Sequence, residues 1–232
     1  MSLRKRYLGL RYGNPEAYNV RDSVSVLEHS RDVNQNNYFN LNVILVGWEV
    51  FDEAEREQIS GAIHVARQLL TQVDVGLGRV VWYDNISVHD HPIVGGVVSR
   101  LFAEKITNLY YAGNDGLDVF FFKSVEGVLG FSAHGGPCDK RVRREEQTAV
   151  VVSLDHAHES TAERTVTSIG VTIVHEALHY MGLETSENGN DFHSLIQGNV
   201  LVSGATSGTT EITRTQADTA RRHCLMNDPC RR

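Results

Sequence analysis

Two histidines and a glutamate stand at a spacing that suits metal-assisted catalysis. Residues 175–179 read His-Glu-Ala-Leu-His, which matches the pattern HExxH. Side chains four residues apart lie on the same face of a helix, so the imidazoles of His175 and His179 can reach one metal ion. The pattern predicts Zn²⁺, with Glu176 beside a metal-bound water as the general base.

The segment around this motif has the pattern of a buried helix. Residues 161–181 are apolar on most sides, and one narrow polar strip contains Thr172, His175 and His179. We expect a helix of this kind to be buried, with its polar strip facing a cleft. Gly182 follows at the point where such a helix would have to end and turn.

The remaining pattern alternates between strands and helices. An amphipathic helix of about 20 residues should begin after Asp52, with Glu55 completing a capping box. A last helix is expected over 213–223, with Thr213 as its N-cap, and residues 94–111 should be a loop with some helix. Short apolar runs predict five strands. These runs are 43–46, 80–83, 119–122, 128–131 and 149–154.

The chain resembles a known family of metalloproteases. The likeness to the metzincins, whose motif is HExxHxxGxxH or HExxHxxGxxD, is carried by His175, Glu176, His179, Gly182 and Leu183. The order of strands and helices is also similar. The resemblance implies an α/β (α+β) zincin catalytic domain over 38–232. Residues 1–37 are polar and irregular, and we expect them to form an N-terminal extension of unknown role. The domain would contain a twisted five-stranded mixed sheet, an active-site helix and a C-terminal helix.

The third zinc ligand departs from the family motif. The expected position holds Thr185, and threonine is a poor ligand for Zn²⁺. We favour His193, because the polar residues after Leu183 are numerous enough to form the insertion that it requires. Two carboxylates remain as alternatives, Glu184 and Asp191.

A second spacing also favours His193. Metzincins have a Met-containing turn beneath the zinc, often eight residues after the third ligand and with a glycine between. Gly198 and Leu201 stand five and eight residues after His193, so this turn would carry leucine in place of methionine. Met226 is a competing Met-turn residue, but it follows the last helix. Glu211 would be the third ligand of a gluzincin, although no supporting pattern surrounds it.

The function implied by the resemblance is a zinc-dependent endopeptidase acting on protein or peptide substrates. The resemblance also implies that a substrate adds as a strand along the edge that precedes the central strand at 149–154. Residues 130–132 could be part of this edge, where main-chain pairing tolerates many sequences. The alternative is a non-catalytic, metzincin-like binding protein with a weakened metal site.

Composition excludes several other classes. The net charge of −7 argues against general affinity for nucleic acid, and no apolar run is long enough for a transmembrane helix. No signal peptide is recognisable, so the sequence favours a cytoplasmic location, with export by a signal-independent route as the alternative. Of the three cysteines, Cys224 and Cys230 could pair and leave Cys138 free, and three reduced thiols are equally compatible.

Overall fold

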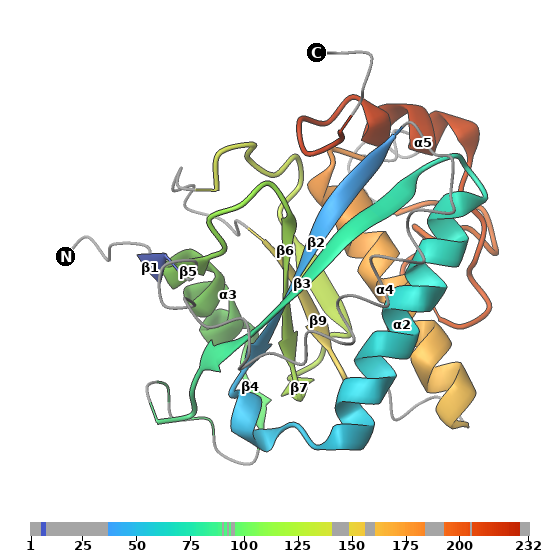
Figure 1. Cartoon of the computed structure of the whole chain (residues 1–232). Helices are drawn as coiled ribbons and strands as arrows, with labels where there is room; N and C mark the ends of the chain where they lie inside the picture. Colours follow the sequence, from blue (N-terminus) through green and yellow to red (C-terminus); the bar gives the residue numbers. More distant parts are fainter. Residues whose placement is uncertain are drawn as a thin grey trace.

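Three layers make up the fold, with a twisted sheet between helices (Figure 1). The computed structural model describes residues 6–7, 37–89, 91, 93, 96–140, 149–155, 161–183, 193–204 and 206–227. One face of the sheet packs against α2 (Glu53–Thr71) and α4 (Ala162–Tyr180), and the other packs against α3 (Arg100–Leu109).

The central sheet has five strands and is mixed, which confirms the predicted fold class. Four strands are parallel, and the short β8 pairs antiparallel with β9 at one edge. The five predicted runs correspond to these five strands, although β2 and β3 are longer than expected. The order is β3 (Gly76–Ile86), β2 (Tyr38–Val46), β6 (Leu117–Phe122), β9 (Val150–Ser153) and β8 (Gly130–Ser132).

Helices on both faces explain why the strands are apolar without interruption. In β2, Val43 and Leu45 face α2 and α4, whereas Ile44 and Val46 face α3. Parallel strands covered on both sides have this pattern, since successive side chains enter opposite layers of the core.

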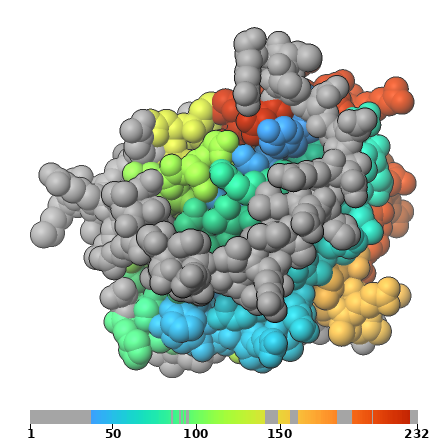
Figure 2. All heavy atoms as spheres, in the orientation of Figure 1, coloured from blue at the N-terminus to red at the C-terminus, as the bar shows by residue number. Residues whose placement is uncertain are grey.

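Local signals determine where α2 begins and how closely it approaches α4. The Asp52 carboxylate accepts from the backbone N–H of Glu55 at 2.8 Å, and the Glu55 carboxylate accepts from Asp52 N–H at 2.9 Å. This is the predicted capping box. A Cβ at Gly170 of α4 would lie 2.7 Å from Val65 Cβ of α2, so glycine is needed at this contact. The first turn of α4 reaches the surface beside α2 (Figure 2).

The smaller elements surround this core. Thr213 caps the last helix, as predicted, with its hydroxyl accepting from Gln216 N–H at 3.2 Å. Within the expected N-terminal extension, the structure describes Asn37 and the strand β1, which pairs with β5. No helix in the described part of the chain is long and apolar enough to cross a membrane. The remaining elements are β1 (Arg6–Tyr7), η3 (Trp48–Val50), β4 (Val97–Val98), β5 (Tyr110–Tyr111), β7 (Ser124–Val125) and α5 (Arg214–Arg221).

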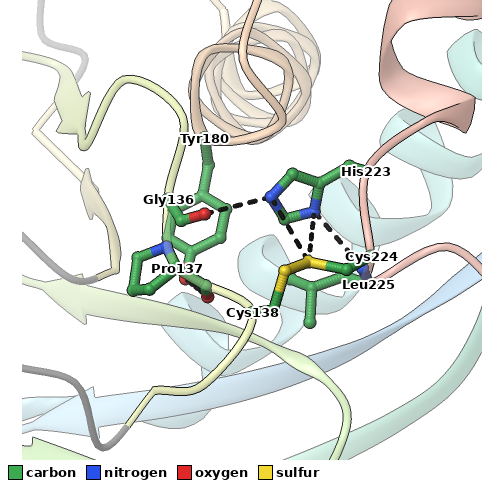
Figure 3. The surroundings of a disulfide bond; sticks show 7 residues. All are labelled: Gly136, Pro137, Cys138, Tyr180, His223, Cys224 and Leu225. Atoms are coloured by element: carbon green, nitrogen blue, oxygen red, sulfur yellow. Dashed lines mark hydrogen bonds between the residues drawn. A yellow bond between two sulfur atoms is a disulfide. The ribbon is translucent and has the colours of Figure 1, made fainter.

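The cysteines do not follow the sequence prediction. Cys138 forms a disulfide with Cys224, so the expectations of a Cys224–Cys230 pair and of three reduced thiols are both wrong. The two partners are 86 residues apart in sequence, but the fold brings the loop after β8 against the end of α5 (Figure 3). Cys230 lies outside the described residues.

Candidate metal centre

The helix α4 carries His175, Glu176 and His179, and its C-terminal turn orients one of them. Gly182 has φ of 87°, a left-handed conformation that glycine adopts without strain. It allows Leu183 N–H to donate back to Leu178 O and its own N–H to His179 O, which is a Schellman motif. The same turn places Leu183 O within 3.1 Å of His179 Nδ1, which donates to it.

A second segment, residues 193–201, brings His193 to the same place. Ser194 N–H donates to Leu201 O at 2.8 Å, which closes the segment into a loop. Gly198 within this loop has φ of 90°. The carbonyl of Val200 accepts from His175 Nδ1 at 2.7 Å, so the predicted turn at 198–201 contacts α4 directly.

The three histidines converge on one point. One ligand atom from each of His175, His179 and His193 lies within 4.8 Å of the others. Their ring centroids are 4.7, 5.3 and 5.4 Å apart. Among the described residues no other histidine, cysteine or carboxylate belongs to such a group, and Glu211 is exposed and outside it. Glu184 and Asp191 lie outside the described residues.

The hydrogen bonds of two rings leave nitrogen lone pairs facing each other. His175 and His179 each donate from Nδ1 to a backbone carbonyl, so in a neutral ring Nε2 carries no proton. These two Nε2 atoms are 3.1 Å apart, a distance that neutral acceptors do not favour without a proton or cation between them. The residues therefore fit a metal ion of the kind that imidazoles bind.

Burial keeps both rings neutral, as metal ligation requires. His175 and His179 are 6% and 3% exposed. Their removal from water, together with the neighbouring imidazoles, lowers the pKa of His175 to about 4 and that of His179 to about 3, against the opposing hydrogen bonds to Val200 O and Leu183 O. The sequence predicted that the polar strip of α4 faces a cleft, but the strip is largely buried. Thr172 is buried as well as the two histidines, because β8 packs against it.

Glu176 lies at the edge of the histidine cluster. Its Oε1 is 3.9 Å from His175 Nε2, and its Oε2 accepts from the Ser132 hydroxyl at 2.9 Å. Burial raises the pKa of Glu176 to about 8, against the opposing effects of Ser132 and of the charge on Arg100. The carboxyl therefore favours its neutral form when no cation is near, and a bound cation would favour the carboxylate.

Sequence reasoning missed two side chains beside the cluster. Ser132 was considered only as part of a strand edge, and nothing in the spacing of the chain pointed to His134. The His134 ring lies edge-on to His179, with centroids 4.9 Å apart. Both residues come from β8 and the loop after it, far from α4 in sequence, so only the three-dimensional structure shows their proximity.

Leu201 and Met226, the two residues considered for the turn beneath the metal, are both buried in the core. Leu201 is fully buried in the core between the sheet, α2 and α4, and it ends the segment that carries Val200. Met226 is also buried in that core, after α5.

Comparison with known proteins supports the fold but does not establish the activity. No family model matches the sequence, and no curated protein matches it significantly. Among solved structures, the crystal structure of archaemetzincin from Methanopyrus kandleri is similar, with a TM-score of 0.53 and 13% sequence identity. The match covers 79% of this chain and 94% of that one. The chain therefore has a metzincin-like fold.

Proposed function

We propose that this protein is a zinc-dependent endopeptidase whose metal is held by His175, His179 and His193. The convergence of three imidazoles, with two unprotonated Nε2 atoms face to face, is the observation that carries the proposal. The metzincin-like fold and the HExxH pattern support it. Bound zinc would supply a Lewis acid that acidifies a water molecule and polarises a carbonyl group.

Glu176 is assigned the role of general base. It follows His175 in the helix and lies beside the cluster without belonging to the ligand group. Its carboxylate would take the proton of the attacking water and pass it to the leaving amine. Ser132 fixes the carboxylate through Oε2, which leaves Oε1 on the side of the histidines.

The substrate class follows from the edge of the sheet. Among the described residues, β8 pairs with β9 on one side and with no strand on the other, and its residues Phe131 and Ser132 precede His134 at the cluster. An extended peptide paired with this edge would bring its backbone past Glu176. Main-chain recognition of that kind favours protein or peptide substrates over other hydrolysable groups.

The proposal is tested by comparing two glutamates of the same helix. Glu176→Ala should retain zinc while losing cleavage of a fluorescent casein, whereas Glu163→Ala, at the exposed start of α4, should behave as wild type. Cleavage that survives Glu176→Ala in purified protein would contradict the mechanism. Stoichiometric zinc in a wild-type protein that cleaves none of a panel of unfolded proteins would favour a non-catalytic binding protein.

The cytoplasmic location predicted from the sequence remains part of this proposal, and one feature opposes it. Disulfides such as Cys138–Cys224 persist mainly in oxidising compartments. Alkylation of thiols in intact cells, followed by mass analysis, distinguishes a reducing cytoplasm from an oxidising compartment. A cytoplasmic protein whose disulfide is reduced should carry three alkylated cysteines, whereas an exported protein that keeps the disulfide should carry fewer.

A further inference from the structure

The loop after β8, residues 133–140, is held in place at many points although it has no regular secondary structure. The N–H groups of Gly135 and Gly136 donate to the last carbonyls of α4, those of His179 and Tyr180, at 3.1 and 2.7 Å. The Tyr180 hydroxyl donates to Pro137 O at 3.0 Å (Figure 3). We call this segment the clamped loop.

Its far end is fastened to other parts of the fold. Cys138 is bonded to Cys224, and His223 Nε2 donates to Gly136 O at 3.1 Å (Figure 3). Lys140 is buried, and its ammonium contacts Asp118 Oδ1 at 2.8 Å. Gly136 itself lies so close to the Tyr180 ring that a Cβ there would be 2.2 Å from it. The clamped loop therefore has a fixed position relative to the end of the zinc helix.

His134 is the residue of this loop that reaches the metal centre. Its ring lies 4.9 Å from that of His179, as close as the rings of the three candidate ligands lie to one another. However, His134 does not belong to the group of converging ligand atoms, and its side chain is exposed whereas His175 and His179 are buried. It thus borders the same space from the solvent side.

We infer that His134 is a further catalytic residue, which donates a hydrogen bond to the carbonyl oxygen of the scissile peptide. This inference rests on the proposed peptidase function. When the oxygen of a water molecule adds to the carbonyl carbon, the π electrons of the C=O bond move to the carbonyl oxygen. A proton of the water passes to Glu176. A donor fixed beforehand beside that oxygen stabilises the negative charge as it forms.

The position of His134 along the sheet edge suits this role. A peptide paired with β8 runs beside Ser132, and the chain reaches His134 two residues later. Ser132 is buried, and its hydroxyl donates to the Glu176 carboxylate, which lies on the side of His175. His134 faces the opposite part of the cluster, next to His179, where a carbonyl held at the metal centre would be within reach.

Two substitutions separate hydrogen bonding from ring packing. His134→Phe keeps an aromatic ring against His179 but removes the donor, whereas His134→Gln supplies an amide donor. We expect His134→Phe to bind zinc normally and to lose about 10²–10³-fold in kcat, with KM changed far less. His134→Gln should recover at least about tenfold of that loss. His64→Phe, an exposed histidine on α2, is the matched control and should leave kcat unchanged.

The outcomes that overturn the inference are distinct from those that overturn the proposed function. If His134→Phe keeps a wild-type kcat, His134 is not catalytic, even though zinc binding and the loss of activity in Glu176→Ala stand. If His134→Phe loses zinc, the residue is a metal ligand and the inference is wrong. If wild-type protein binds zinc but cleaves nothing, the peptidase function fails and the inference fails with it.

Discussion

The Cys138–Cys224 disulfide should contribute a large part of the stability of this protein. Its partners are 86 residues apart, and a cross-link that closes a loop of this length restricts the unfolded chain strongly. The loop-closure relation gives about 4–5 kcal/mol at 25 °C. Because small domains unfold with only about 5–15 kcal/mol, Cys138→Ser should be marginally stable.

Chemical denaturation of a set of single variants measures this contribution. Cys138→Ser and Cys224→Ser should lower the free energy of unfolding by similar amounts, since each opens the same loop. Cys230→Ser is the matched control and should change it by less than about 1 kcal/mol. Under denaturing conditions the oxidised wild type should expose one free thiol, because two of its three cysteines are paired. A large loss in Cys230→Ser with none in Cys138→Ser would refute the assignment.

Two further substitutions test the surroundings of the metal centre. A Cβ at Gly130 would lie 2.6 Å from Thr172 Cγ2, so Gly130→Ala should cost about 1–3 kcal/mol and reduce any peptidase activity about tenfold or more. Gly208→Ala, where nothing lies within 4 Å, should have little effect, and equal behaviour of the two variants would contradict the packing argument. Asn199→Ala removes a buried amide pair with Gln216 beside the turn at 198–201, and zinc affinity should fall about 10–100-fold by competition with a chelator. An unchanged zinc affinity would show that this pair does not support the site.

Local sequence signals were sufficient for most of the fold. The capping box at Asp52 and Glu55 predicted where α2 begins, since both partners lie within one turn. The run from Ala149 to Leu154 is apolar except for Ser153, which indicated a central strand before the neighbouring strands were known. Gly182 indicated the end of α4 because a left-handed turn there needs glycine. Each of these signals depends on residues close together in sequence.

Contacts between distant segments could not be predicted in the same way. Sequence spacing suggested Cys224 with Cys230, because short loops are easily closed, whereas the actual partner Cys138 lies in the loop after β8, 86 residues earlier in the chain. Likewise, His134 has no spacing relation to the HExxH motif and reaches His179 only through the clamped loop. The candidate site is therefore partly a local motif and partly a product of the tertiary structure.

Zinc content is the most direct test of the three-histidine centre. Purified wild-type protein should contain about one zinc ion per chain by mass spectrometry of the metal, and His193→Ala should lose most of it under the same conditions. His64→Ala, on the exposed face of α2, should retain the wild-type content. Full zinc content in His193→Ala, together with loss of zinc in Glu184→Ala, would contradict the assignment of His193 and would identify Glu184 as the third ligand.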